Sequence, residues 1–313
     1  MPRAGGGPSG GAAMSLPPEP TVQPGLAPAL AAYAMWGFLP LYLLLVREVP
    51  AFEFVGWRII FTLPVCLLIV ALRRQGPDLR RALTDRRSLL VLCGSATLIG
   101  VNWFVYVWAI QRGEVLAASL GYYVNPLLNV LLGTLFLGER LTRRQWLAVA
   151  LAGCGVALLL AGALTTLWIS LALAGTFAFY GLLKKQVAVG SLPGLTIETV
   201  ILLPLALAIV LHYAGAPVGP SFGQETGQSL AIALGGVVTA VPLLLFAVAA
   251  RQLDYSVLGM VQFTAPTIVF VIGLTVFRQP LDWVQLACFA FIWAALALFV
   301  WDLLARRRAK LAG

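Results

Sequence analysis

The sequence is poor in charge: 11% of its 313 residues are Asp, Glu, Lys or Arg, and only 12 residues are acidic. Soluble domains carry about 25% charged residues, so this composition excludes an ordinary soluble protein. His212 is the only histidine, and the sequence lacks HExxH, GxSxG, paired aspartates and a nucleotide-binding loop. We therefore expect neither an enzyme nor a bound cofactor.

The cysteines exclude two further classes of protein. Each of the four stands alone inside an apolar run, without CxxC or metal-ligand spacing: Cys66, Cys93, Cys154 and Cys288. This pattern predicts buried thiols rather than a disulfide framework or a metal centre. The net charge of +9 would suggest nucleic acid as partner of a soluble protein, but here most of the positive charge lies between hydrophobic runs, where it sets membrane topology.

What the chain does have is apolar length. Hydrophobic residues make up 60% of it, and its mean hydropathy is +0.93. A membrane-spanning helix needs about 17 to 25 apolar residues. Ten runs meet this requirement, at about residues 29–46, 53–72, 89–110, 115–137, 145–161, 166–183, 195–213, 229–250, 255–277 and 283–304. The sequence therefore predicts an all-α polytopic membrane protein with ten transmembrane helices.

The two ends of the chain differ from these runs. Residues 1–28 are rich in Gly, Pro and Ala and lack the apolar segment of a signal peptide, so we expect a disordered cytoplasmic tail in which Met14 is an alternative start. Residues 306–313 are expected to form a basic cytoplasmic tail. Of the 21 Lys and Arg residues, 17 fall on the side of the two termini and three, Arg47, Arg112 and Arg278, on the other. This bias predicts that both termini are cytoplasmic.

The two halves of the chain resemble each other at an offset of 140 residues. The matches are Pro64 with Pro204, Pro126 with Pro266, Gly133 with Gly273, Leu141 with Leu281, and Gln145 with Gln285. Hydrophobic runs also align by chance, but the Pro and Gly matches recur over five consecutive runs. They predict two five-helix repeats, residues 29–162 and 163–305. Because five is odd, the repeats would be inverted in the membrane, as in many secondary transporters.

A proline interrupts the most polar of the runs. Pro126 lacks an N–H and lies halfway along residues 115–137, where Tyr122, Asn125 and Asn129 follow one another at helical spacing on one face. Unpaired amides are costly in lipid, so we expect this face to turn inward, either to bind substrate or to bond other helices. Pro126 and its counterpart Pro266 are the predicted hinges of the two halves.

Several motifs resemble the drug/metabolite transporter superfamily, EamA type, and within it the RarD branch. They include Gly100-Val101-Asn102-Trp103, Asn125-Pro126-Leu127, Gly138-Glu139-Arg140, Phe177-Ala178-Phe179-Tyr180-Gly181-Leu182 and Ile197-Glu198-Thr199. The resemblance implies a ten-helix permease of the plasma (inner) membrane that moves a small molecule, and the branch is named in connection with chloramphenicol. The second half departs from the pattern, since Arg278-Gln279-Pro280 stands where the first has Gly138-Glu139-Arg140, so the two gates need not work symmetrically.

Two charged residues lie within the runs at equivalent repeat positions. Arg58 is about a turn and a half into the second run, and Glu198 is about a turn into the seventh, entering from the opposite side. Their depths place them more than about 10 Å apart, so we expect no direct ion pair. Arg58 either extends to the headgroups or attracts an anionic group of the substrate. Glu198 either extends to the inner surface, or couples transport to protons, or pairs with a cation.

Aromatic residues and amides complete the predicted substrate site. Asn102, Trp103 and Tyr106 lie on the third run, while Tyr33, Trp36, Phe177 and Tyr180 lie on repeat-related helices and Gln262 and Thr264 precede Pro266. An aromatic box with a few amides suits a flat amphipathic molecule. The alternatives are interfacial aromatic belts and interhelical hydrogen bonds.

These features predict a secondary-active exporter that works by alternating access, with protons as a candidate coupling ion. An exchanger or facilitator of amino acids or other metabolites is the alternative, and a non-transporting membrane scaffold is a second. The expected partners are the lipid bilayer and a small-molecule substrate, with no nucleic acid.

Overall fold

The computed structural model describes residues 24–112, 114–161, 164–217, 219–278, 280 and 283–312, and within these ranges the chain is helical without a strand. The first half forms α1 (Leu26–Leu43), η1 (Leu44–Val46), α2 (Ala51–Leu72), α3 (Gly76–Thr84), α4 (Arg86–Gln111), α5 (Val115–Phe136) and α6 (Arg143–Leu160). The second half forms η2 (Leu164–Thr166), α7 (Leu167–Gln186), α8 (Ser191–Ala214), α9 (Thr226–Gln252), α10 (Tyr255–Gln262), α11 (Thr264–Thr275) and α12 (Trp283–Ala312).

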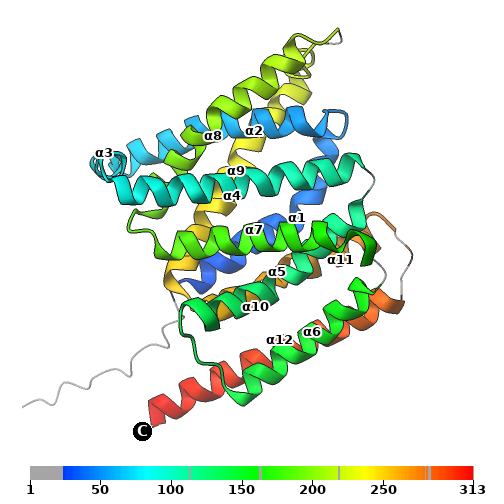
Figure 1. The fold of residues 1–313 in the computed structure, drawn as a ribbon. Coiled ribbons are helices and arrows are strands. Elements are labelled where there is room, and N and C mark those ends of the chain that lie inside the picture. The colour runs from blue at the N-terminus through cyan, green and yellow to red at the C-terminus, as the bar shows by residue number, and fades with distance from the viewer. Residues whose placement is uncertain are drawn as a thin grey trace, which may run out of the picture.

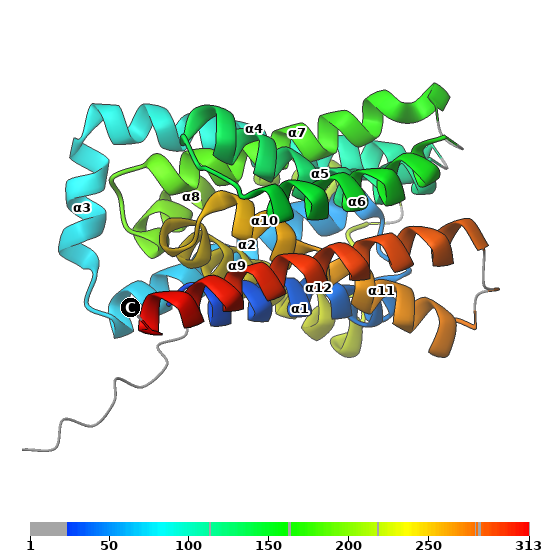
Figure 2. The same cartoon turned by 90° about the horizontal axis from the view of Figure 1, so that it is seen from below.

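The all-α polytopic prediction is confirmed. Among the described residues, nine helical segments are long and apolar enough to cross a membrane, and they coincide with nine of the ten predicted runs. The remaining run forms α5, an uninterrupted helix of 22 residues that is not among those nine. The count of ten spans therefore stays a prediction. The start of α1 and the end of α12 lie at the same end of the bundle (Figures 1 and 2), and which side of the membrane this end faces also stays a prediction.

The first and last helices extend into the segments that were predicted to be tails. α1 begins at Leu26, inside the stretch predicted as a tail, whereas Met14 lies outside the described residues. At the other end α12 continues to Ala312, because Ala, Leu, Lys and Arg all favour helix once the chain has left the apolar run. The Arg306 side chain folds back one turn, and its Nε lies 3.1 Å from the carboxylate of Asp302. The predicted tail is therefore a continuation of the last helix over these residues.

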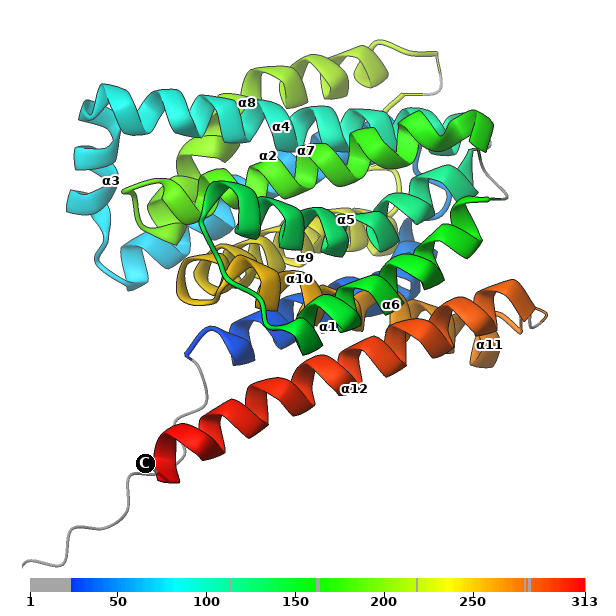
Figure 3. The ribbon, with the colours of Figure 1, turned by 60° about the horizontal axis from the view of Figure 1, so that its bottom comes forward.

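The packing of the helices follows a two-fold pattern. α2 contacts α8, α5 contacts α10 and α6 contacts α12, and each of these is a pair of repeat-equivalent helices. The remaining main contacts form three pairs that correspond when the halves are exchanged. The α1–α9 contact corresponds to α4–α7, the α1–α11 contact to α5–α7, and the α2–α9 contact to α4–α8. Figure 3 shows α6 and α12 side by side along one edge, with α2 and α8 on the opposite side. Exchange of the two halves thus reproduces the contacts.

The two predicted hinge prolines lie in different local structures. Pro126 is inside the continuous α5, whereas the equivalent run breaks at Phe263, between α10 and α11 and three residues before Pro266. α5 and α10 approach each other closely beside Pro126, where a Cβ added to Gly259 would lie 2.6 Å from the Pro126 carbonyl oxygen. The crossing of these two helices therefore depends on a residue without a side chain.

α3 connects α2 to α4 and lies across the ends of the long helices (Figure 2). Its apolar residues Leu79 and Ala82 join a small core with Leu92 and Ile197, while its arginines are exposed. Asp85 ends the connection and caps α4, since its carboxylate accepts hydrogen bonds from the backbone N–H groups of Arg87 and Ser88. α3 is therefore an amphipathic helix held at one end of the bundle.

Candidate functional site

A buried ion pair joins α7 to α8. The Lys184 Nζ lies 3.1 Å from each carboxylate oxygen of Glu198, and both side chains are 2% exposed. Ser95 of α4 donates its hydroxyl to the same carboxylate, and the Tyr180 hydroxyl lies 3.4 Å from it. Because burying a charged side chain is costly unless it is paired and hydrogen-bonded, these contacts offset the burial of Lys184 and Glu198 inside the bundle.

Arg58 is a half-buried charge in a different environment. Its guanidinium lies over the ring of Trp103, 4.4 Å from the ring centroid, and three tyrosines, Tyr42, Tyr106 and Tyr122, are near enough to interact with it electrostatically. The Nε of Arg58 is buried and has no hydrogen-bond partner among the described residues. Within that part of the chain no carboxylate forms an ion pair with Arg58 either.

A small cavity lies beside Glu198. It has a volume of about 10 Å³, and Trp103, Tyr180 and Glu198 are among the residues that line it. A volume of this size holds about one water molecule. The structure thus brings three predicted site residues, Trp103, Tyr180 and Glu198, to one cavity between α2, α4, α7 and α8, and Arg58 contacts the Trp103 ring that lines it. At this volume the site is closed to any larger ligand.

The predicted amides form a separate network that connects helices. The Asn129 amide N–H donates to the side-chain oxygen of Gln262 at 2.8 Å and to the side-chain oxygen of Asn125 at 3.3 Å. The amide N–H of Asn125 in turn donates to the Ala174 carbonyl at 2.7 Å. The Tyr33 hydroxyl lies 3.4 Å from the same Gln262 oxygen. Asn125 and Asn129 are buried, as their helical spacing predicted. These four side chains therefore meet where α1, α5, α7 and α10 come together.

Two other predicted residues differ in their setting. Asn102 is buried, and its amide donates to the Leu173 carbonyl at 2.8 Å and to the Thr176 hydroxyl at 2.9 Å, so it links α4 to α7. Tyr122 does not share the burial of the asparagines on its face, because 50% of it is exposed. Its ring meets that of Tyr106 at 6.1 Å, beside Arg58.

The aromatic residues of α1 and α7 come together as one cluster. The ring of Trp36 lies 5.6 Å from Tyr33 and 5.7 Å from Phe177, and Phe177 lies 5.9 Å from Tyr180. Phe246 of α9 contacts all four rings and stacks on Tyr180 at 6.0 Å. Within this cluster Tyr180 lines the small cavity beside Glu198, and the rings of Phe177 and Phe246 pack against Tyr180.

Sequence reasoning missed Lys184, Ser95 and Phe246. Lys184 stands at the end of an apolar run and was counted among the surface charges. One signal was present: Lys184 follows Tyr180 by four residues and so lies on the same helical face. Among the described residues no cluster of His, Cys, Asp and Glu could hold a metal ion.

A second carboxylate lies at the end of the bundle that carries α3. Glu139, in the connection between α5 and α6, is half-buried and contacts the start of α10. Beside it, Lys185 of α7 donates to the Ala250 and Leu253 carbonyls at the end of α9, and Arg251 donates to the Val187 and Val189 carbonyls. The Glu139 contact joins the two halves at this end, whereas the Lys185 and Arg251 bonds lie within the second half.

Comparison with known proteins supports a membrane transporter. Residues 23–161 match the EamA-like transporter family. An uncharacterized transporter of Pseudomonas aeruginosa is 43% identical over 87% of this chain and 92% of its own length. Protein RarD of Salmonella typhimurium is 40% identical over 91% of this chain and 97% of its own.

Two further proteins resemble this chain, one in sequence and one in fold. A chloramphenicol-sensitive protein RarD of Pseudomonas aeruginosa is 30% identical over 89% of this chain and 94% of its own. One solved crystal structure, of a protein that is 21% identical, superposes on 91% of this chain and all of that one with a TM-score of 0.71. At that identity the likeness shows the fold alone.

Proposed function

Because the chain belongs to the EamA-like transporter family, in its RarD branch, we propose that it exports a small amphipathic molecule carrying an anionic group by alternating access. Family membership and the apolar helices make it a multi-pass membrane transporter. The direction, the substrate and the placement in the plasma (inner) membrane are part of the proposal.

The unpaired cation beside the cavity carries this proposal. Arg58 has no carboxylate partner among the described residues, and it lies on the Trp103 ring that lines the cavity. Its Nε is buried without a hydrogen-bond partner, and a desolvated cation without a counter-ion is costly, so a substrate anion would supply the missing partner. The neighbouring aromatic faces would hold the flat apolar part of the same molecule. Asn125, Asn129 and Gln262 then act by holding the helices rather than by direct contact.

Glu198 is the proposed coupling residue. In the conformation described here its carboxylate is neutralised by Lys184, so a proton can bind only as that pair opens. Protonation would leave Lys184 as a second unpaired cation next to the cavity, which an anionic substrate could neutralise. Proton binding and substrate binding would thereby be linked through one ion pair.

The same pair favours a second candidate function. A carboxylate that remains paired with Lys184 through the whole cycle binds no proton, and the chain would then act as a gradient-independent exchanger or facilitator of amino acids or other metabolites. The two candidates differ in how transport responds to a pH gradient and to the loss of the Glu198 charge.

The test is transport by purified protein in liposomes. A mixed pool of metabolites together with chloramphenicol is offered with and without a pH gradient, and mass spectrometry identifies what crosses. We expect gradient-dependent movement of an anionic amphiphile, reduced about tenfold to a hundredfold in Arg58→Gln. Arg47→Gln is the matched control, because Arg47 is exposed and pairs with Glu48 only at 3.7 Å.

Glu198→Gln distinguishes the two candidates. Loss of the pH dependence supports proton coupling, whereas unchanged transport and pH dependence would remove Glu198 from that role. Transport that needs no gradient in either form would favour the exchanger. If folded, inserted protein moved none of the compounds, the carrier proposal would be overturned.

A further inference from the structure

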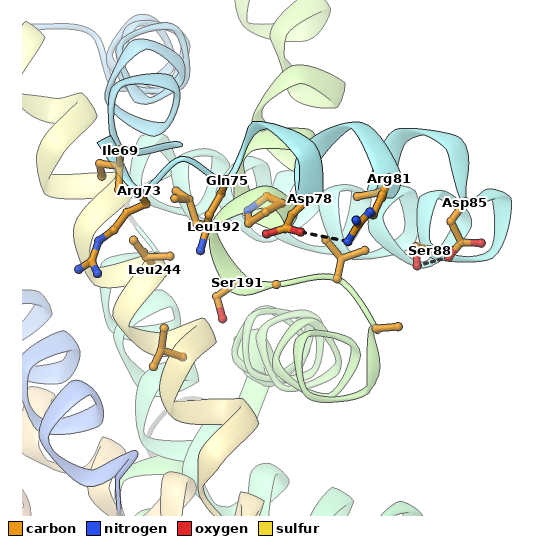
Figure 4. Close-up of a pocket in the computed structure, with 16 residues that line it drawn as sticks. Ile69, Arg73, Gln75, Asp78, Arg81, Asp85, Ser88, Ser191, Leu192 and Leu244 are labelled. Atoms are coloured by element: carbon orange, nitrogen blue, oxygen red, sulfur yellow. Dashed lines mark hydrogen bonds and ion pairs between the residues drawn. The ribbon is translucent and has the colours of Figure 1, made fainter. Parts of the chain in front are cut away.

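A second cavity, of about 610 Å³, lies at the end of the bundle that carries α3. Its walls are the end of α2, α3, the start of α4, the connection from α7 to α8, and α9. It shares no lining residue with the cavity beside Glu198. Figure 4 shows Arg73 and Ile69 at the end of α2, with Leu244 of α9 below them.

The lining of this cavity is amphiphilic. Arg73, Gln75 and Ser191 give it a polar side, and Ile69, Leu192 and Leu244 give it an apolar side. The helices that contribute the apolar side are among those long enough to span a membrane, and α3 lies across their ends. The polar side is therefore at the depth of lipid headgroups, and the apolar side continues toward the hydrocarbon region.

The charges around the cavity leave one cation free. Asp85 is engaged at the start of α4, where the hydroxyl and N–H of Ser88 and the N–H of Arg87 hold its pKa below the usual value. Asp78 lies 3.7 Å from Arg81. Arg73 is exposed, and within the described part of the chain its side chain forms neither an ion pair nor a hydrogen bond. The cavity thus presents an unpaired guanidinium beside an apolar wall.

Gln75 places an unpaired hydrogen-bond acceptor in the same cavity. Its Oε1 is buried and has no hydrogen-bond partner among the described residues, although the residue lines the cavity. A buried acceptor without a donor costs about 1 to 3 kcal/mol. A molecule that fills the cavity would satisfy both groups if it carried an anion for Arg73 and an O–H donor for Gln75.

We propose that this cavity binds one anionic glycerophospholipid with a hydroxyl-bearing headgroup, of the phosphatidylglycerol type. The phosphate pairs with Arg73, a headgroup hydroxyl donates to Gln75, and an acyl chain lies against Ile69 and Leu244. A soluble anion would leave the apolar wall uncovered, whereas a zwitterionic lipid would place its own cation next to the arginine. Phosphate is the group that guanidinium binds best, and anionic lipids attract each nearby basic residue.

The experiment measures lipid binding to the full chain in detergent by native mass spectrometry. Phosphatidylglycerol, phosphatidic acid and phosphatidylcholine are added separately, and inorganic phosphate is added as a competitor. We expect one tight phosphatidylglycerol per chain, and about fivefold weaker binding in Arg73→Gln. Arg74→Gln is the matched control, because it removes the same charge from the adjacent residue, which does not line the cavity.

Gln75→Leu tests the hydroxyl contact separately. It removes an acceptor that has no partner among the described residues, so we expect no loss of stability, which thermal unfolding checks. It should weaken the binding of phosphatidylglycerol but not of phosphatidic acid, which has no headgroup glycerol. Equal effects of Arg73→Gln and Arg74→Gln would overturn the proposal, since they would indicate diffuse surface charge. Equal binding of phosphatidylcholine, or displacement of the lipid by inorganic phosphate, would overturn it as well.

Discussion

Glu139 accepts hydrogen bonds from the backbone N–H, at 2.8 Å, and from the hydroxyl of Ser256, which lies in the opposite half of the chain. The backbone N–H of Tyr255 donates to the other oxygen of the same carboxylate. The first N–H groups of a helix have no partner within it, and the side chain of the N-cap residue of α10, Asp254, makes no capping bond. A carboxylate from the first half therefore caps a helix of the second.

Replacement of Glu139 by Ala should lower the free energy of unfolding by about 1 to 2 kcal/mol, because it removes this cap. Thermal unfolding in detergent measures the loss. Glu225→Ala is the control: Glu225 is the N-cap of α9, but its side chain makes no capping bond there, so its loss should matter by less than about 0.5 kcal/mol. Equal stability of the two variants would show that the contact contributes nothing.

The Lys184–Glu198 pair should behave as one unit in unfolding experiments. Removal of either partner leaves a buried charge, so Lys184→Met and Glu198→Gln should each destabilise the protein by about 3 to 5 kcal/mol. The double variant buries no charge and should be more stable than the sum of the single effects predicts. A double-mutant cycle measures this coupling, and strictly additive effects would contradict it.

Replacement by Ala should have opposite effects at two glycines, Gly259 at the crossing of α5 and α10 and Gly175 on α7. Gly259→Ala would bring its Cβ to 2.6 Å from the Pro126 carbonyl oxygen, so we expect a destabilisation of about 1 to 3 kcal/mol. A Cβ at Gly175 of α7 meets nothing within 4 Å, and Gly175→Ala should be neutral or stabilising by up to about 1 kcal/mol. Thermal unfolding of both variants checks the order, and a stable Gly259→Ala would contradict the geometry.

The hinge hypothesis concerns rates rather than stability. Pro126→Ala restores a backbone N–H inside α5, and one added hydrogen bond of about 1 kcal/mol should slow transport about fivefold by stiffening the helix. Pro266 lies in the first turn of α11, where an N–H has no partner within the helix, so Pro266→Ala should slow transport less. Pro64→Ala is the control, because Pro64 lies in α2, away from the α5 and α10 crossing. Wild-type rates in both hinge variants would show that the two halves do not bend there.

The apolar runs were predictable because a bilayer requires about 20 apolar residues for each crossing, a demand that composition alone reveals. The inward face of Asn125 and Asn129 was predictable for the same reason, since lipid does not tolerate free amides. Their partner Gln262 was harder to find. It occupies the repeat position equivalent to Tyr122, and the two helices meet only because the halves pack around a common axis.

The partner of Glu198 was not predictable from charge counting. Lys184 comes at the end of an apolar run, where basic residues usually mark the membrane surface, yet α7 continues to Gln186 and buries it. Burial of such a residue depends on a carboxylate and a hydroxyl that reach it from α8 and α4. Contacts of this kind arise from three-dimensional packing and have no local signature in the sequence.

Arg58 and Glu198 occupy equivalent positions of the two halves but carry opposite charges, and only Glu198 has a counter-ion among the described residues. In a carrier with two identical halves, the inward-open and outward-open conformations would be related by symmetry and equal in free energy. Opposite charges at equivalent positions remove that degeneracy, so the empty carrier would rest in one conformation more than in the other. In the proposed cycle, the charge difference between the halves would thereby set a preferred resting conformation.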